Sequence, residues 1–248
     1  MRRVVTRQSV QSTGELMSEM GQVRTQPWTQ TAALLEVDGL GCVKEPLASG
    51  QGVIVLGPHL GDWERLGMHL ATLDKLVAFC EPISLKKIDQ LVHRGRQCTG
   101  GKLVPTMPRS IAELVPRCEP AALPASCLIE FLMTKMQASM RLFFGVECFT
   151  PALASNLIKQ SGAAPVMGAV LRTEKGFRAV CRPAEPGVHS DDTLEVLSAN
   201  NRGVRKLIAG KERQYQWQCK RFRCPPKGLV NHYDWSAMSL LDEASLKR

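Results

Sequence analysis

The hydrophobic residues of this chain gather in short runs that alternate with stretches of helical periodicity. The run at residues 53–56 (VIVL) is continuous, mostly β-branched and bounded by glycines. Such a run is typical of a strand that is buried on both faces of a parallel sheet. Apolar residues then recur at helical spacing over residues 62–75. This region is therefore predicted to be a strand, a tight turn and a helix, which together form the first half of a βαβ unit.

The same alternation continues toward the C-terminus. Strands are predicted at residues 76–79, 102–105, 164–171 and 177–181, and helices at residues 84–93, 110–117 and 191–208. The last helix has an acidic first turn and a basic end, which suits the helix dipole. Alternating strands and helices indicate an α/β fold, here a single domain with a mainly parallel central sheet flanked by helices.

The two ends of the chain depart from this pattern. Residues 1–34 are polar and mildly basic, with a loose helical period that is clearest from Leu16 to Val23. We expect a helix there that lies across the body of the protein or on a surface. Residues 35–228 are assigned to the α/β domain and residues 229–248 to a C-terminal tail.

Composition narrows the class of protein. Of 248 residues, 44% are hydrophobic and 22% are charged, which is ordinary for a globular domain and argues against disorder. No apolar run reaches the roughly 18 residues of a membrane span, and the arginine-rich start lacks the apolar core of a signal peptide. The nine cysteines show no CxxC or CxxH spacing and are interpreted as free thiols in a reducing compartment. We therefore expect no metal and no cofactor.

The net charge of +9 indicates a polyanionic partner. Most of the excess lies in residues 202–227, where there are nine basic residues and one acidic residue. The interleaved aromatic residues fit either an anionic membrane surface or a nucleic acid. A third interpretation is a strand in which Tyr215, Trp217 and Cys219 face the core. For the basic residues, an acidic headgroup or carrier protein is favoured over nucleic acid.

The candidate chemistry lies directly after the first predicted strand. His59 occupies the sheet edge where ligands bind in open α/β folds, and Glu64 follows five residues later, just over one helical turn. A carboxylate on one ring nitrogen stabilises the imidazolium and leaves the other nitrogen to take a proton from a substrate hydroxyl. The alternative is that His59 caps the turn and Glu64 is a solvated helix residue. Ser126 lies outside a G-x-S-x-G elbow, which argues against a serine hydrolase.

Three ordered segments resemble a known family. Residues 52–64 (GVIVLGPHLGDWE) are similar to the first motif of the lysophospholipid acyltransferase superfamily, specifically its late lipid A branch of lauroyl and myristoyl transferases. Residues 94–105 are similar to the Arg-containing second block of that branch, and residues 214–223 to its C-terminal signature. Weaker similarity is present at residues 142–145 and 161–166.

The resemblance implies transfer of a fatty acyl chain from the thioester of an acyl carrier protein or acyl-CoA. The acceptor would be a hydroxyl of a lipid A-like saccharolipid or a lysophospholipid. His59 would act as the general base and Glu64 would orient it, while Arg96, or Arg94 in its place, would pair with a phosphate of donor or acceptor. The implied location is the cytoplasmic face of a bacterial inner membrane.

The chain also departs from the pattern of that family. The branch usually begins with an inserted hydrophobic helix, and its absence here favours a truncated chain or peripheral attachment. A further acidic motif is expected near residues 121–127, where no acid is present, and Glu130 could substitute for it only by a shift in register. The alternative function is therefore a catalytically impaired member that serves as a lipid-binding or nucleic-acid-binding scaffold.

An acyl chain needs an apolar slot, and the crevice beside His59 is the expected place for it. The candidate lining residues are Trp63, Leu66, Leu142, Phe143 and Phe144. Each of these could equally belong to the core.

Overall fold

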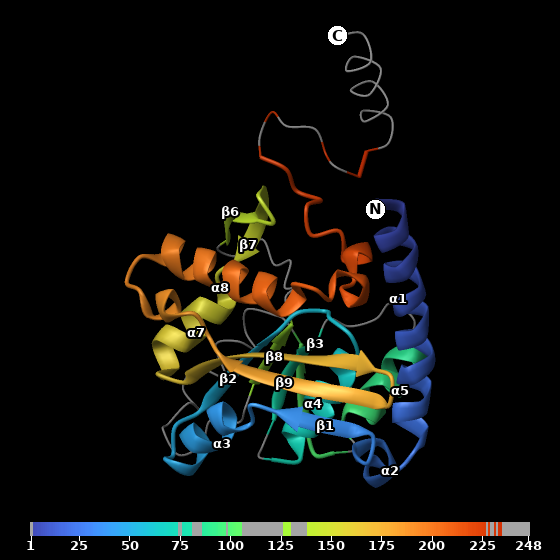
Figure 1. The fold of residues 1–248 in the computed structure, drawn as a ribbon. Coiled ribbons are helices and arrows are strands. Elements are labelled where there is room, and N and C mark those ends of the chain that lie inside the picture. The colour runs from blue at the N-terminus through green and yellow to red at the C-terminus, as the bar shows by residue number, and fades with distance from the viewer. Residues whose placement is uncertain are drawn as a thin grey trace.

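The computed structural model describes residues 2–73, 76–80, 86–97, 99–105, 126–129, 138–226, 228, 231, 233 and 234. A seven-stranded sheet in the order β1-β9-β8-β2-β5-β3-β4 forms its centre (Figure 1). Its strands are β1 (Leu35–Asp38), β2 (Val53–Gly57), β3 (Val77–Cys80), β4 (Lys102–Pro105), β5 (Ser126–Ile129), β8 (Ala164–Thr173) and β9 (Gly176–Pro183). Every neighbouring pair is parallel except the β8–β9 hairpin. The predicted α/β fold with a mainly parallel sheet is therefore confirmed.

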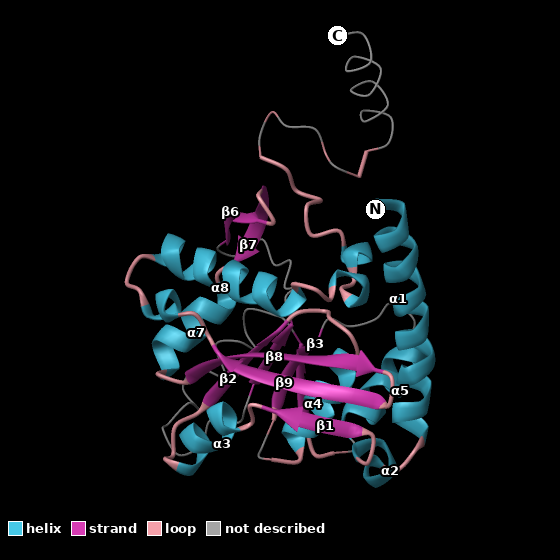
Figure 2. Cartoon of the chain, viewed as in Figure 1, coloured by secondary structure: helices cyan, strands magenta, loops and turns pink. Residues whose placement is uncertain are grey.

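Helices cover both faces of this sheet (Figure 2). They are α1 (Arg2–Thr25), α2 (Trp28–Ala32), α3 (Gly41–Ala48), α4 (Trp63–Ala71), α5 (Lys86–Gln97), α7 (Leu153–Ser161) and α8 (Thr193–Ile208). A separate antiparallel hairpin, β6 (Ala138–Phe143) and β7 (Val146–Pro151), projects beyond α8 (Figure 1).

Strand β2 shows why the core divides in two. All five of its residues are buried, as its continuous apolar sequence predicts. Because successive side chains of a strand point to opposite faces, Ile54 and Leu56 pack in the cluster that contains α7 and α8 side chains. Val53 and Val55 pack in a second cluster with side chains from α3 and α4. The end of β2 is thereby fixed between two packed layers.

Helix α1 lies along one side of the molecule, as expected, and ends at Thr25, within the N-terminal segment 1–34 where a helix was predicted (Figure 1). The side chains of Leu16 and Val23, on the inner face of α1, are buried. The Ser9 hydroxyl donates to the Tyr215 carbonyl at 2.9 Å, and the Arg172 Nε donates to Glu19 at 2.7 Å. These contacts join the N-terminal helix to the C-terminal segment and to β8.

The interpretation of residues 215–219 as a strand was wrong. Tyr215 instead lies between two short 3₁₀ turns, η3 (Glu212–Gln214) and η4 (Trp217–Cys219). Tyr215 is buried because it forms an isolated bridge with Leu60, in the turn after β2, rather than by pairing along a sheet edge. The apparent alternation of apolar residues therefore reflects one buried position between two turns.

Two predicted helices differ from the structure mainly in where they end. Helix α5 continues four residues beyond the predicted His93, to Gln97, whereas α4 ends at Ala71 rather than Lys75. The sequence did not predict strands β1 and β5, helices α3 and α7, or the β6–β7 hairpin. The helix predicted at 110–117, Glu130 and most of the tail at 229–248 lie outside the described residues.

Candidate active site

The turn after β2 is built by backbone pairing to two other segments. The Gly61 N–H donates to the Gln214 carbonyl at 3.0 Å, and the Asp62 N–H donates to the Val170 carbonyl at 2.9 Å. The Gln216 N–H donates to the carbonyl of His59 itself at 2.9 Å. Strand β8 and the C-terminal segment thus fix the backbone of the turn from His59 to Asp62.

Gly61 makes this close packing possible. Its φ of +63° lies in the left-handed region that favours glycine. A Cβ at this position would meet the Val170 carbonyl oxygen at 1.9 Å, far inside van der Waals contact. The glycine of the H-L-G-D-W-E sequence is therefore required by the approach of β8, and its presence lets His59 project at the sheet edge.

His59 lies among aromatic and polar groups at the carboxyl end of β2. Its ring stacks on Trp63, with centroids 4.7 Å apart and an interplanar angle of 28°. Its Nδ1 lies 3.2 Å from the Cys219 Sγ. Burial, and secondarily the positive charge of Arg96, lowers the pKa of His59 to about 3. The imidazole is therefore neutral at physiological pH, the state in which a ring nitrogen can accept a proton.

Glu64 is bound by Arg96 of helix α5. The Arg96 Nε donates to Oε2 at 2.8 Å and the Nη2 donates to Oε1 at 2.6 Å, so the guanidinium and carboxylate meet as a two-pronged pair. The Arg96 guanidinium also lies over the Trp63 ring, 5.2 Å from its centroid. Trp63 thus contacts both His59 and Arg96. The carboxylate of Glu64 thus contacts Arg96, and its role in orienting the His59 ring stays a prediction.

The other predicted polar residues are placed differently. Arg94, two residues before Arg96 on α5, is exposed. Glu130 lies outside the described residues, so its role as a substitute acid stays a prediction.

Two residues of this site were not found from the sequence. Asp62 caps α4, accepting from the Arg65 backbone N–H at 3.3 Å, and its other oxygen accepts from the Arg65 Nε at 2.6 Å. An acid directly before a predicted helix is a capping signal, so this contact could have been predicted. Cys219 lies 160 positions from His59 in sequence, and nothing in its neighbourhood indicated a contact.

Comparison with known proteins identifies the family of the chain. A family model described as bacterial lipid A biosynthesis acyltransferase matches residues 1–224, most of the chain. The chain belongs to this family. A search of curated proteins found no match. Membership establishes the protein as an acyltransferase, which acts with an acyl donor and a lipid acceptor.

The acyl-groove candidates of this acyltransferase divide into core and surface residues. Leu66 and Phe143 are buried, and they lie in different core clusters. Leu142 and Phe144 are among the exposed large hydrophobic residues. The Phe144 ring lies 5.6 Å from that of Trp217, and Phe143 lies 6.3 Å from Tyr215. An aromatic cluster therefore connects the β6–β7 hairpin with the segment that contacts His59. Its members are Phe143, Phe144, Tyr215, Trp217 and Phe222.

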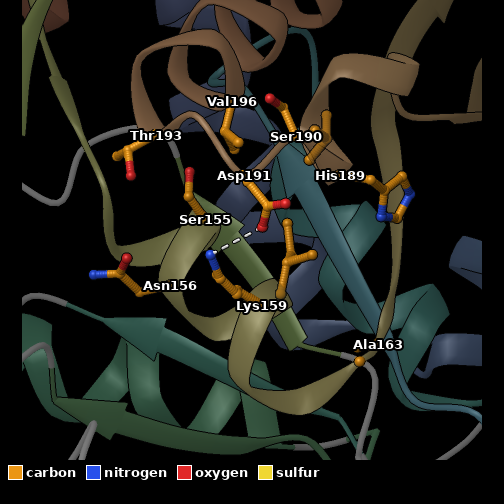
Figure 3. A pocket seen from close by; sticks show the side chains of 12 residues that line it. Ser155, Asn156, Lys159, Ala163, His189, Ser190, Asp191, Thr193 and Val196 are labelled. Carbon is orange, nitrogen blue, oxygen red and sulfur yellow. Dashed lines mark hydrogen bonds and ion pairs between the residues drawn. The ribbon is translucent and has the colours of Figure 1, made fainter.

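Two cavities adjoin α8. One, of about 590 Å³, lies between the hairpin and α8 and is lined by Leu142, Phe143 and Phe144 together with Arg202 and Arg205. A second, of about 230 Å³, lies between α7 and the start of α8, where Lys159 and Asp191 form a 3.4 Å ion pair (Figure 3). Both of these side chains are largely exposed, so the pair adds little stability. Of these two cavities, only the larger is lined by residues that were predicted for the acyl groove.

Some cations of the basic stretch at 202–227 form ion pairs or hydrogen bonds, and many are exposed at the surface. Arg202 pairs with Glu195 at 2.7 Å, and Lys206 pairs with Glu185. Arg221 donates to the Asn201 side chain at 2.6 Å, and burial lowers its pKa to about 9. The exposed cations are Arg205, Lys206, Lys211, Arg213, Lys220 and Arg223. Lys227 lies outside the described residues.

The described part of the chain lacks two further features. No helix there has both the length and the apolar character needed to cross a membrane. Within the same residues, no cluster of three or more His, Cys, Asp or Glu side chains could hold a metal ion.

Proposed function

We propose that this acyltransferase moves a fatty acyl chain from the thioester of an acyl carrier protein or acyl-CoA to a lipid hydroxyl, with His59 as the general base. The acceptor is a lipid A-like saccharolipid or a lysophospholipid. The observation that carries the proposal is the position of His59 at the carboxyl end of the central strand β2, stacked on Trp63 beside the Glu64–Arg96 pair, in a chain of an acyltransferase family.

The chemical step needs one base and no enzyme nucleophile. A ring nitrogen of His59 takes the proton of the acceptor hydroxyl while the oxygen attacks the thioester carbonyl. When the carbon–sulfur bond of the resulting intermediate breaks, the imidazolium returns the proton to the departing thiolate. Because burial holds the pKa of His59 low, the base is unprotonated before each turnover.

Glu64 and Arg96 support this step as a unit. The two-pronged contact holds the Arg96 guanidinium against Trp63, and the stacked Trp63 ring holds His59. Glu64 thereby contributes to the position of the base as well as to that of Arg96. Arg96 places positive charge where the thioester carbonyl oxygen becomes negative, or where a substrate phosphate binds. Exposed Arg94 on the same helix serves the outer part of such a phosphate.

The acyl chain is proposed to extend from His59 along the aromatic cluster. Trp217 and Phe144 form the partly exposed end of this cluster, beside the 590 Å³ cavity. That volume falls within the range of about 300–1,000 Å³ that is usual for small-molecule sites.

Attachment to an anionic membrane surface is proposed to be peripheral and electrostatic. The exposed cations of the C-terminal segment lie beside the arginine-bearing N-terminal helix, because Ser9 and Thr13 of α1 contact Tyr215 and Gln218. A joint basic surface of this kind suits the cytoplasmic face of a bacterial inner membrane.

The direct test is acyl transfer by the purified chain. Labelled acyl carrier protein and acyl-CoA are each supplied with a lipid A precursor or a lysophospholipid, and product lipid and released thiol are measured. His59→Ala should lower transfer by about 10²- to 10⁴-fold, the usual contribution of a general base.

Lys44→Gln, on exposed residue 44 of α3, is the matched control and should transfer normally. Unchanged turnover in His59→Ala would exclude the role of His59. If the folded wild-type chain releases no thiol from either donor but binds lipid, the catalytically impaired scaffold is the correct function. If it binds a DNA duplex more tightly than anionic vesicles at physiological salt, the scaffold serves nucleic acid.

A further inference from the structure

The His59 ring has a sulfur neighbour. The Cys219 Sγ lies 3.2 Å from Nδ1, within hydrogen-bond reach for sulfur, and both side chains are partly exposed. The same sulfur lies 3.7 Å from Oε1 of Gln216, in the geometry of an S–H donor to an amide oxygen. Gln216 is itself buried. The three side chains therefore form a chain of contacts from the protein interior to the ring.

The direction of the hydrogen bonds in this chain follows from the chemistry of its members. The amide oxygen of Gln216 can only accept, so the contact with Cys219 uses the thiol proton. Burial raises the pKa of Cys219 to about 11, so that proton is present at neutral pH. With its proton directed to Gln216, the sulfur can only accept from His59. The neighbouring Nδ1 must then carry the ring proton, which leaves the Nε2 lone pair unprotonated.

We propose that Cys219 and Gln216 are positioning residues that hold His59 in the Nδ1–H tautomer and so make Nε2 the catalytic base. The proposal rests on the proposed function for its catalytic meaning, but the tautomer itself is a property of the resting protein. Neither residue touches the reacting atoms in this role, and no covalent step on sulfur is involved.

The backbone around Cys219 is built to keep the sulfur in place. The Gln216 N–H donates to the His59 carbonyl, and the Cys219 N–H donates to the Gln216 carbonyl at 3.1 Å. Turn η4 ends at Lys220, a non-glycine residue with a φ of +54°. Because this left-handed conformation is costly for lysine, surrounding contacts must hold it. The turn that carries Cys219 is thus tied directly to the residue whose ring it contacts.

The test measures the tautomer and the rate separately. Two-dimensional ¹⁵N–¹H NMR of the imidazole is applied to the wild type, Cys219→Ala, Cys219→Ser, Gln216→Leu and the control Cys224→Ala, which alters an exposed thiol of the same segment. The wild type should show protonated Nδ1 and unprotonated Nε2. Cys219→Ala and Gln216→Leu should show a mixture of tautomers, and their kcat should fall about two- to tenfold at unchanged KM, as expected for one lost hydrogen bond.

Serine supplies both a donor and an acceptor, so Cys219→Ser should restore the tautomer and much of the rate, while Cys224→Ala should match the wild type. A protonated Nε2 in the wild type, or unchanged tautomers in a folded Cys219→Ala, overturns the proposal. So does an acyl adduct on Cys219 by intact mass after donor alone, because the sulfur would then be a nucleophile. A correct tautomer without acyl transfer would overturn the proposed function and leave this inference intact.

Discussion

The two carboxylates at the start of α4 meet two different arginines, and the difference separates structure from function. Asp62 pairs with Arg65 on its own helix, and the two side chains are 0% and 3% exposed. Glu64 pairs with Arg96 of α5, and here the arginine is 18% exposed. The first pair closes a local turn. The second joins two helices beside His59 and reaches the surface.

The physical setting of each pair explains what it can do. Burial raises the pKa of Asp62 to about 6 although Arg65 lowers it, so its charge is held at a cost and no substrate can reach it. The Arg65 guanidinium in turn lies 3.9 Å over the Phe177 ring. The Glu64–Arg96 pair keeps a cation close enough to His59 to lower the pKa of the imidazole. We infer that Asp62 stabilises the turn and that Glu64 serves the reaction.

The largest expected effect is on the buried pair. Asp62→Ala leaves the Arg65 cation buried without its carboxylate and should lower the free energy of unfolding by about 3–5 kcal/mol. Urea titration followed by circular dichroism measures the change. A loss below about 1 kcal/mol would mean that the turn does not depend on this pair.

The second prediction is that a change at Glu64 affects activity more than stability. Glu64→Gln keeps the size of the side chain, and its amide oxygen can still accept one hydrogen bond from Arg96, so the free energy of unfolding should fall by about 1–3 kcal/mol, less than for Asp62→Ala. Acyl transfer should nevertheless fall about 10²-fold, because a displaced Arg96 and Trp63 no longer hold the base. Measured kcat/KM for the variant tests this.

Glu36→Gln is the matched control, since Glu36 forms an exposed pair with Arg178 and should change neither activity nor stability. Equal activity of Glu64→Gln and wild type would make the Glu64–Arg96 pair as structural as the Asp62–Arg65 pair.

The third prediction uses pH to compare His59 with Asp62. The unfolded chain protonates histidine below about pH 6.5, but the folded chain protonates His59 only near pH 3. The unfolded state therefore binds more protons between these values, and stability falls as pH falls, by at most about 1.4 kcal/mol for each pH unit. His59→Gln should remove this part of the acid sensitivity.

Asp62 acts with the opposite sign. Its raised pKa means that the folded state binds more protons between about pH 4 and 6, so its contribution to stability falls as pH rises. Thermal unfolding of wild type and His59→Gln from pH 4 to 7 isolates the histidine. If the difference between the two proteins is constant across this range, the pKa of His59 is not depressed.

The smallest expected effect is on membrane binding and concerns exposed cations, in contrast to Arg65 and Arg96, which pair with carboxylates near His59. Lys211→Gln and Arg213→Gln should each weaken binding to anionic vesicles by about 1 kcal/mol, or roughly fivefold, with a loss that shrinks as salt rises. Vesicle co-sedimentation measures this. Lys44→Gln removes the same charge from α3 and should bind like wild type. Equal weakening by Lys44→Gln would show that only net charge matters.

The sequence predicted those parts of the site that depend on neighbours in the chain. The buried run at 53–56, the turn at His59 and the helix after it were all predicted correctly, since local periodicity and glycine spacing define them. The contact of Glu64 with Arg96 could not be read from spacing, because the relative orientation of α4 and α5 depends on packing.

The C-terminal segment shows the opposite case. Its resemblance to a family signature marked it as important, but its alternation of apolar residues predicted a strand that does not form. Short 3₁₀ turns have no strong periodicity, so their conformation follows from the backbone groups they meet, here those of His59, Leu60 and Gly61.

By itself, the sequence determined the α/β class, the central strand, the position of His59 at its end and, through motif resemblance, the acyltransferase family. Tertiary structure alone decided which side chains surround that histidine. Cys219 and Arg96 reach the site from segments 160 and 37 positions away from His59. The physical reason is that strands and helices are selected by nearest neighbours along the chain. The contacts of the His59 ring, in contrast, are selected by the packing of layers that meet only after the chain has folded.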